Sequence, residues 1–212
     1  MTQHLWAPGP LTAAAAAAAS GLALRPISDR LSGSARVFRA ARNNGGMSTP
    51  EQLVPTVRRA NLTGSDAAQV GKLIADYLIQ TEREKAEHLD GAHGPTPLPE
   101  KYRHEVDDPY SAYASADVYV AELQGHLVGV AVVHSDQDAD ELKRVWVDPA
   151  ARGTGAGSAL LNAALTRDEQ RPLRLTVWRW RDDAIRLYSR RGFQAVASWD
   201  PRPDLICMER RT

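Results

Sequence analysis

Apolar residues between positions 65 and 89 follow the spacing of one helix face. They recur at i, i+3, i+4, i+7 and i+8, as Val70, Leu73, Ile74, Tyr77 and Leu78. This spacing is typical of a stripe that faces a protein core. It predicts a helix that runs from an N-cap at Ser65 to about Leu89. A strand is expected before this helix, near residues 56–61, and a short helix after it, near residues 98–106.

From residue 118 onward, runs of β-branched and alternating apolar residues predict strands. Gln124-Gly125 separates two such runs and indicates a tight hairpin. No segment repeats another. Strands are expected at residues 118–123, 127–134, 140–147, 173–178, 193–199 and 204–210, and helices at residues 155–166 and 182–190.

The first 46 residues differ from the rest in pattern and in charge. They contain seven consecutive alanines, a Gly-Pro pair and an Asn-Asn-Gly-Gly break, and five arginines against one aspartate. With so little periodic apolar pattern, this tail is expected to be disordered or loosely helical. Met47 is a candidate for the biological start, because residues 47–212 hold every recognised motif and are expected to form a single domain. The intact mass of the natively expressed protein would test this expectation.

Composition restricts the class of protein. The 212 residues are 43% hydrophobic, which is enough for an ordinary buried core. Basic and acidic residues number 26 each, so no overall field favours a nucleic acid or a membrane as a partner. The longest apolar run is the alanine tract, much shorter than the roughly 20 residues of a bilayer span, and no basic residue precedes it as in a secretory signal. A cytoplasmic protein is expected. Its single cysteine, Cys207, excludes an intramolecular disulfide and a cysteine-based zinc cluster.

A glycine-rich loop between a predicted strand and a predicted helix is the main candidate for ligand binding. It follows Asp148-Pro149 and places Gly153, Gly155 and Gly157 at alternate positions. Glycines let the backbone approach a ligand closely, and the first turn of the helix presents unpaired N–H groups. Because Arg152 adds a positive charge, the loop is suited to binding a phosphate.

Two common phosphate-binding motifs do not fit this loop. A P-loop requires Lys followed by Ser or Thr after the last glycine, whereas Ser158-Ala159 follow Gly157. A dinucleotide fingerprint requires a third glycine at the position of Leu160. Taken alone, the loop is also consistent with a simple tight turn.

The loop resembles the acetyl-CoA signature Arg-x-x-Gly-x-Gly of the GNAT-type N-acetyltransferase superfamily. A second signature of that family, Ala-x-x-Leu-Tyr-x-x-x-Gly-Phe, is matched by Ala184, Leu187, Tyr188, Gly192 and Phe193. Two motifs in the family's order and distance are more specific than either alone. The resemblance begins near residue 55 and is strongest over residues 141–193. The order of the predicted elements is also that of the family. It implies an α/β (α+β) fold with a mixed central β-sheet flanked by helices on both faces, the GNAT-like acyl-CoA N-acyltransferase fold.

The resemblance implies acetyl-CoA as a cosubstrate and assigns residues to it. Amides of the loop and of the helix start would hold the coenzyme A diphosphate. The preceding strand would splay from its neighbour, offer backbone groups to the pantetheine arm and polarise the thioester carbonyl. Where the family often has Asn, three residues before the Ala of the second signature, this chain has Arg181, and a contact to the cofactor is expected there. The predicted cofactor-binding residues are Val145, Trp146, Val147, Arg152, Gly153, Thr154, Gly155, Ala156, Gly157, Ser158 and Arg181.

Acetyl transfer to an amine also needs proton transfers. An aliphatic amine has a pKa of about 10.4, so a base must remove a proton at pH 7. Glu141 matches a position where the family often places a carboxylate, although it also belongs to an acidic run that fits solvated loop charge. Relatives also use water chains without a dedicated base. Tyr188 matches a tyrosine that protonates the leaving thiolate in many relatives, and its spacing also fits plain packing of a helix on the sheet.

Recognition of the acceptor is left open by the sequence. In the family it usually involves the first two helices and their connecting loop, where carboxylates would suit a cationic amine. Interleaved basic residues fit an ordinary salt-bridged surface just as well. The residues concerned are Tyr77, Glu82, Glu84, Glu87, Tyr102, Glu105, Asp107 and Asp108.

Two further clusters are interpreted as structural. Trp178-Arg179-Trp180-Arg181 could stack on nucleic-acid bases, but the neutral charge balance favours packing. His88, His93 and His104 lack paired carboxylates at ligand spacing, so no metal site is predicted.

The expected function is an acetyl-CoA-dependent N-acetyltransferase that acts on a primary amine of a small molecule, peptide or protein through a ternary complex. The alternative is a noncatalytic acyl-CoA-binding sensor or scaffold that keeps the phosphate-binding loop and lacks an acceptor pocket. An enzyme that acetylates a nucleic-acid partner, such as a charged tRNA, would need a basic surface near the pocket. A monomer and a homodimer fit the sequence alike, and so do an acetyl and a longer acyl group.

Overall fold

The computed structural model describes residues 54–89, 97–168 and 170–211. All of them lie within one unit, Ser48–Thr212, so the expected tail and the candidate start at Met47 lie outside the described residues. The strands are β1 (Thr56–Arg59), β2 (Ala116–Leu123), β3 (His126–Ser135), β4 (Asp140–Val147), β5 (Leu173–Trp178), β6 (Gln194–Ala195) and β7 (Leu205–Arg210). The helices are α1 (Ala67–His88), α2 (Arg103–Asp107), α3 (Pro109–Ala112), α4 (Ala156–Leu165) and α5 (Asp182–Ser189), with 3-10 turns at Glu100–Tyr102 and Pro149–Ala151.

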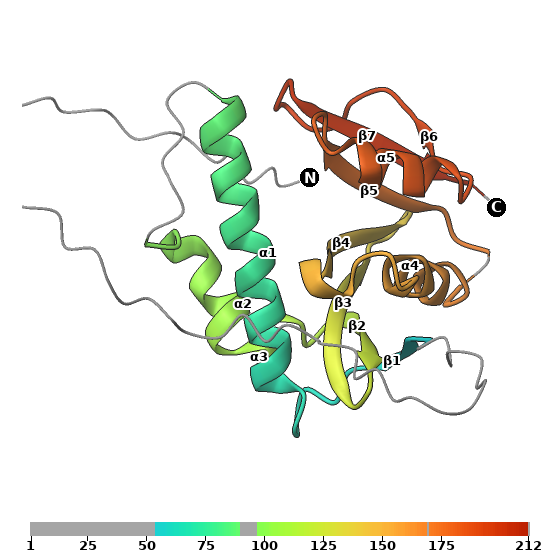
Figure 1. The fold of residues 1–212 in the computed structure, drawn as a ribbon. Helices are drawn as coiled ribbons and strands as arrows, with labels where there is room; N and C mark the ends of the chain where they lie inside the picture. Colours follow the sequence, from blue (N-terminus) through green and yellow to red (C-terminus); the bar gives the residue numbers. More distant parts are fainter. Residues whose placement is uncertain (1–53, 90–96, 169, 212) are drawn as a thin grey trace, which may run out of the picture. The chain divides into compact units, whose positions relative to one another are not determined.

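The strands form one mixed sheet in the order β1-β2-β3-β4-β5-β7-β6 (Figure 1). Every neighbouring pair is antiparallel except β4 and β5, which are parallel. Gln124 and Gly125 join β2 to β3 with φ values of +53° and +77°. Positive φ at both central residues matches the twist of the two strands, which confirms the hairpin predicted here.

Helix α1 covers one face of the sheet, and α2 and α3 pack beside it (Figure 1). Its predicted stripe is buried except at Tyr77, which is partly buried, and Val70, Ile74 and Leu78 belong to the same core cluster as Val120 and Val132. Fully burying such a side chain stabilises the fold by about 1.5–3 kcal/mol. The stripe therefore fixes which side of α1 faces the sheet.

Close packing of α1 against α2 depends on Gly71. A Cβ at this position would lie 2.4 Å from the backbone oxygen of Val106. Because no real Cβ is found so near a backbone atom, any larger residue would push the two helices apart. Gly71 thus sets the distance between α1 and the segment that contributes Tyr102.

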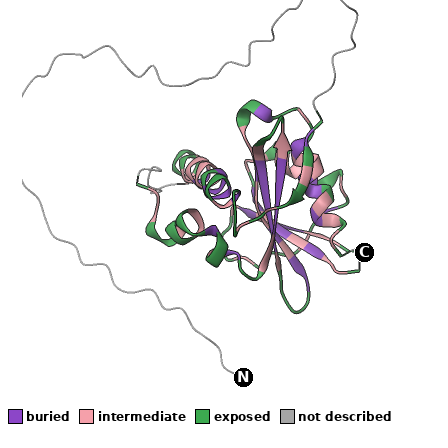
Figure 2. Ribbon diagram, turned by 90° about the horizontal axis from the view of Figure 1, so that it is seen from below, coloured by how far each residue is buried: buried purple, intermediate pink, exposed green. Residues whose placement is uncertain are grey.

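Helix α4 packs on the opposite face. Its buried residues join those of the strands, of α5 and of the chain after it in a second core cluster, which includes Leu160, Leu161, Leu175, Tyr188 and Phe193. Buried residues follow the strands between the helices, and exposed residues follow the outer helix surfaces (Figure 2). A mixed sheet with helices on both faces is therefore confirmed.

Three elements differ from the sequence predictions. Helix α1 begins at Ala67, with Asp66 rather than Ser65 at the N-cap position, and the Asp66 carboxylate accepts hydrogen bonds from Arg58. The four-residue helix α3 was not predicted, since it is too short for a periodic pattern. Strand β6 has two residues instead of seven, because the chain leaves β7 to form a loop closed by Ser198 and Asp200.

Among the residues that the structure describes, no helix combines the length and the apolar character needed to cross a bilayer.

Candidate functional site

The two parallel strands β4 and β5 separate soon after they meet. Their pairing is limited to Asp140 with Leu173 and Glu141 with Arg174. Beyond this point the edge of β4 that faces β5 has no strand beside it, so backbone groups along residues 142–147 stay open toward the gap. The structure thus has the splay that the family resemblance implied.

A bulge in β4 determines which of its residues face this gap. The register with β3 shifts between Val130 and Val132, and Arg144 has a positive φ of +53°. As a result, Leu142 packs in the core cluster that contains α4, whereas Trp146, four residues later, packs in the cluster that contains α1. Val145 and Val147 pack on the α4 side. Periodicity alone would have placed residues 142 and 146 on the same face.

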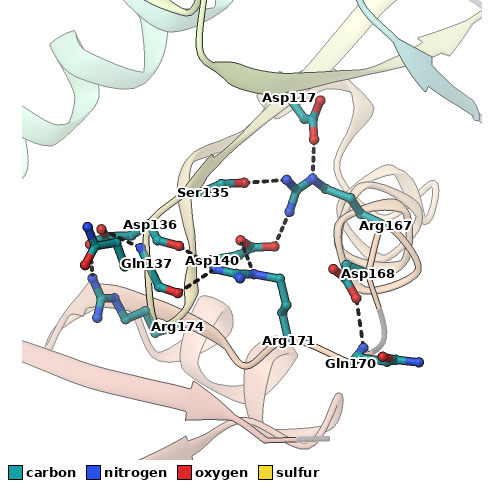
Figure 3. Close-up of polar contacts among 10 residues, drawn as sticks. All are labelled: Asp117, Ser135, Asp136, Gln137, Asp140, Arg167, Asp168, Gln170, Arg171 and Arg174. Atoms are coloured by element: carbon teal, nitrogen blue, oxygen red, sulfur yellow. Dashed lines mark hydrogen bonds and ion pairs between the residues drawn. The ribbon is translucent and has the colours of Figure 1, made fainter.

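A network of ion pairs holds the closed end of the splay (Figure 3). Asp140 is only 3% exposed and accepts hydrogen bonds from Arg167 and, at 3.1 Å, from Nε of Arg171. Arg167 also donates to Asp117 and to the Ser135 hydroxyl. A buried carboxylate is tolerated when it is paired in this way. The network ties β2, β3 and β4 to the chain that leads from α4 into β5.

The glycine-rich loop forms one wall of a cleft of about 880 Å³, here called the glycine-loop cleft. Gly153 and Gly155 have φ values of +83° and +93°, which only glycine adopts without strain. The N–H groups of the loop and the first turn of α4 donate to no other residue that the structure describes, and these are Gly153, Gly155, Ala156, Gly157 and Ser158. All five residues line the cleft, and unpaired N–H groups with the positive end of a helix dipole attract an anion.

Arg152 also lines the glycine-loop cleft. Its Nε donates to the backbone oxygen of Val147 at 3.3 Å and its Nη2 to Oε1 of Gln80 at 3.2 Å. Its guanidinium carbon lies 5.0 Å from the centre of the Trp146 ring. Thr154 does not line the cleft, because its hydroxyl turns back to the carbonyl of Ala151 at 2.7 Å and closes the loop.

A second cleft, of about 490 Å³, lies where β4 and β5 diverge below α1. We call it the basic cleft, after the lysines and arginines along its wall. Four residues line both clefts and mark the place where they meet: Val145, Arg181, Ala184 and Tyr188. A ligand on the glycine-rich loop and a second ligand in the basic cleft would therefore approach each other beside Val145 and Tyr188.

Tyr188 is 7% exposed, and its hydroxyl makes no hydrogen bond to any other described residue. Burial, with nearby Tyr77, raises its pKa above the usual 10.0, although Arg181 acts in the opposite direction. The hydroxyl is therefore protonated at neutral pH and free to donate to a ligand at the junction. Its ring also packs on Phe193, at 5.8 Å between ring centres, so the predicted packing role and a chemical role are compatible.

Arg181 lines both clefts, and its guanidinium is hydrogen-bonded to residues of α1. Its Nε donates to Oε2 of Glu84 at 2.6 Å and its Nη2 to the Thr81 hydroxyl at 2.7 Å. Its guanidinium carbon lies 5.3 Å from the centre of the Tyr77 ring. These contacts join the start of α5 to α1. Since both partners are about a hundred residues away in the sequence, spacing could not reveal them.

Glu141 lines the basic cleft together with Tyr188. Its side chain is 22% exposed and pairs with Nζ of Lys143 at 3.1 Å. The structure thus brings the two predicted catalytic residues to one cleft, with Glu141 already in an ion pair. Arg174, its neighbour on β5, also lines this cleft.

An aromatic column of Trp178, Trp180 and His88 lies beside the clefts, and the contact of His88 with the tryptophans was not predicted. Trp178 and Trp180 stack at 4.8 Å between ring centres, and His88 stacks on Trp180 at 4.6 Å. Nε1 of Trp180 donates to Glu84 at 3.1 Å. The column holds the end of α1 against β5, in line with the packing interpretation of the two tryptophans.

Comparison with known proteins gives the following matches. Residues 114–195 match the family model of the acetyltransferase (GNAT) domain. None of the curated proteins that were compared matches the chain. Among solved structures, an acetyltransferase of the GNAT family from Staphylococcus aureus Mu50 aligns with a TM-score of 0.56 and 14% identity, over 74% of this chain and 98% of that one.

Two more solved structures align over the same share of this chain. A protein of Corynebacterium glutamicum ATCC 13032, described as "histone acetyltransferase HPA2 and related acetyltransferase", has a TM-score of 0.53 and 21% identity, over 74% of this chain and 96% of that one. The PaiA N-acetyltransferase of Thermoplasma acidophilum, solved in complex with coenzyme A, has a TM-score of 0.53 and 14% identity, over 74% of this chain and 99% of that one. At these identities the matches show a common fold.

Proposed function

We propose that this chain, which belongs to the GNAT superfamily of acetyltransferases, transfers an acetyl group from acetyl-CoA to a primary amine in a ternary complex. The observation that carries the proposal is the meeting of two clefts beside Val145 and Tyr188. One cleft has an anion-binding loop and the other has room for an acceptor. Direct transfer requires this arrangement, because donor and acceptor must be bound at the same time.

In this proposal the glycine-loop cleft binds the donor. The unpaired N–H groups of Gly153 and of residues 155–158 receive the diphosphate, and Arg152 adds charge at its edge. The pantetheine arm follows the open edge of β4, past Val147 and Val145. Superfamily membership and the coenzyme A complex of the Thermoplasma relative support this placement of the donor. The finer choice of acetyl-CoA over a longer acyl-CoA is part of the proposal.

The chemical step is placed at the junction of the clefts. The neutral amine attacks the thioester carbonyl carbon, and an amide of β4 near Val145 stabilises the oxyanion. Glu141 takes a proton from the amine, directly or through water, after parting from Lys143. The carbon–sulfur bond then breaks, and Tyr188 gives its proton to the leaving thiolate. The position of Tyr188 at the junction of the clefts supports this role, because its hydroxyl is protonated at neutral pH and the residue lines both clefts.

The test is release of free thiol when purified protein is incubated with acetyl-CoA and a panel of amines. Thiol release that depends on the amine supports the proposal. Binding of acetyl-CoA by calorimetry without thiol release favours the noncatalytic sensor or scaffold instead. Absence of both would contradict the whole assignment. A cytoplasmic location and a monomeric or dimeric state stay predictions from the sequence.

Replacing Tyr188 with phenylalanine tests the proposed role of its hydroxyl as the general acid. We expect kcat to fall about a hundredfold or more, as for loss of a general acid, with the dissociation constant of coenzyme A unchanged. Tyr119→Phe is the matched control, because Tyr119 is also 7% exposed and lies outside both clefts. Unchanged turnover in Tyr188→Phe would leave Tyr188 with a packing role only.

A further inference from the structure

The wall of the basic cleft has an excess of positive charge. Among the residues that the structure describes, two acidic ones line it, Glu141 and Asp200. The basic residues that line it number seven: Lys85, Lys101, Lys143, Arg144, Arg174, Arg181 and Arg202. This bias is local, since the chain as a whole has no net charge. We infer that the acceptor is a small amine that also carries an anionic group, a carboxylate or a phosphate, which this wall binds; the inference rests on the proposed function.

Three of these seven cations, Lys85, Arg144 and Arg181, are held in place by carboxylates that lie outside the cleft. Arg144 donates two hydrogen bonds to Glu105, at 2.6 and 2.7 Å, and Lys85 pairs with Glu82 at 2.6 Å. Glu82, Glu84 and Glu105 do not line the cleft, whereas their basic partners do. The ion pairs therefore present cations to the cleft and keep the carboxylates outside it. Positive groups fixed in this way lose little conformational freedom when they bind an anion.

Some donors on the wall are not committed to a protein partner. Lys101 pairs with no carboxylate in the part of the chain that the structure describes, and its Nζ lies 4.8 Å from the centre of the Tyr102 ring. Nε of Arg174 is buried and has no hydrogen-bond partner among the described residues. A buried donor without an acceptor costs about 1–3 kcal/mol, which an anionic ligand would recover. Lys101 and Arg174 are therefore the main candidates to contact the anionic group.

A cationic acceptor fits this cleft poorly. The sequence left open the possibility that carboxylates of the first two helices and their connecting loop recognise a cationic amine. In the structure three of them, Glu82, Glu84 and Glu105, are occupied by Lys85, Arg181 and Arg144. A second amine on the substrate would meet cations here, and like charges in contact repel.

The cleft also limits the body of the acceptor. Its volume of about 490 Å³ is in the range of small-molecule sites. Aromatic side chains on both sides offer flat apolar surfaces, and these are Tyr77, Tyr102, Trp178 and Trp199. Burial and its contact with Glu82 raise the pKa of Tyr102 to about 12, so its hydroxyl stays uncharged. A free amino acid or a phosphorylated amine with an apolar body matches this combination of charge, size and surface.

The first experiment measures acceptor binding by calorimetry with coenzyme A present, so that it does not depend on turnover. Each common amino acid is compared with its own amide, and phosphoethanolamine with ethanolamine, which separates carboxylate from phosphate. The amide is a stringent control, because its amine is less basic and more of it is neutral. We expect at least one ligand with an anionic group to bind about tenfold or more tightly than its counterpart without that group. If the counterparts without an anionic group bind as well throughout, or if no ligand with an anionic group binds, the inference is wrong.

The second experiment tests which basic side chains of the cleft contact the anionic group of the ligand. Lys101→Met and Arg174→Met are expected to lower the affinity for the anionic ligand about tenfold each and to leave the affinity for the counterpart without the anionic group unchanged. Lys72→Met is the control, because Lys72 is exposed and pairs with Asp76 on the outer surface of α1. An unchanged preference in both cleft variants would overturn the assignment to this wall. Thiol release is measured in parallel. Release only with amines that lack an anionic group keeps the proposed function and refutes the anionic acceptor. Binding of anionic ligands without any thiol release contradicts the proposed function and, with it, the role of these ligands as acceptors.

Discussion

Replacing Gly155 with alanine tests two properties of the glycine-rich loop, namely its effect on the stability of the fold and its binding of coenzyme A. Gly155 precedes α4 with φ +93° and ψ −2°, and an added Cβ would meet no atom within 4 Å. The added methyl group therefore causes no clash. The substitution lowers the free energy of unfolding by about 1–2 kcal/mol, because an L residue is strained in the left-handed region. In a protein of this size that lowers Tm by a few degrees. If the backbone relaxes to negative φ instead, the neighbouring N–H groups rotate away from the cleft. Loss of one hydrogen bond to a charged phosphate weakens coenzyme A binding about 10- to 100-fold.

Two other glycines provide matched controls. Gly125 in the β2–β3 hairpin has φ +77° and equally open surroundings, so Gly125→Ala should lose similar stability and keep coenzyme A binding. Gly157 lies inside α4, where a Cβ would make ordinary contacts of 3.6 Å with Val147 and 3.7 Å with Leu187. Gly157→Ala should therefore keep or raise stability, by up to about 0.5–1 kcal/mol, and still weaken binding because its methyl group lies in the cleft.

Denaturant unfolding and calorimetry with coenzyme A measure the two properties separately on each variant. The expected pattern is loss of both stability and binding in Gly155→Ala, loss of stability alone in Gly125→Ala, and loss of binding alone in Gly157→Ala. If Gly155→Ala and Gly157→Ala bind coenzyme A as tightly as the original protein, the loop does not hold the diphosphate and the reasoning fails.

Two further predictions concern the scaffold. Asp140→Asn should lower the free energy of unfolding by about 1.5–3 kcal/mol, because it removes the buried charge that Arg167 and Arg171 share and leaves Arg167 with Asp117 as its only carboxylate among the described residues. Asp76→Asn in an exposed pair should change it by less than about 0.5 kcal/mol, and equal effects in urea melts would contradict the clamp at the closed end of the splay. Burial alone would raise the pKa of Glu105, but the hydrogen bonds and charge of Arg144 outweigh it and hold the pKa below its usual range. A lowered pKa in the folded state contributes stability above the unfolded value of about 4.3, and this contribution is lost as pH falls below it. Unfolding measured from pH 7 to pH 3 should therefore show a decline below about pH 4.5, which is smaller in Glu105→Gln.

Most of the fold could be predicted because it depends on local patterns. The stripe on α1, the hairpin at Gln124-Gly125 and the alternation in β5 are each set by residues within one element, and each element was found where expected. The bulge at Arg144 could not be predicted, because it depends on the register between β4 and β3. It decides that Val145 and Val147 pack on the α4 side, opposite Trp146.

In the candidate site, too, one part could be predicted from local sequence and another part could not. The glycine-rich loop is contiguous, so its positive φ values and free amides follow from Gly153, Gly155 and the start of a helix. The position of Arg181 did not follow from its motif. Its contact to Glu84 joins residues 97 apart in the sequence, and only the packing of α1 over the diverging strands brings them together.

By itself, the sequence determined the order of the elements, a glycine-rich loop suited to an anion and two motifs that resemble the superfamily signatures, because these depend on neighbouring residues and on hydrophobic period. Only the tertiary structure decided that the two clefts meet beside Val145 and Tyr188, and that the basic cleft is lined by cations. The physical reason is that charge in a cleft depends on which partner of each ion pair faces inward. That choice is made by packing between segments far apart in the chain, and no local pattern records it.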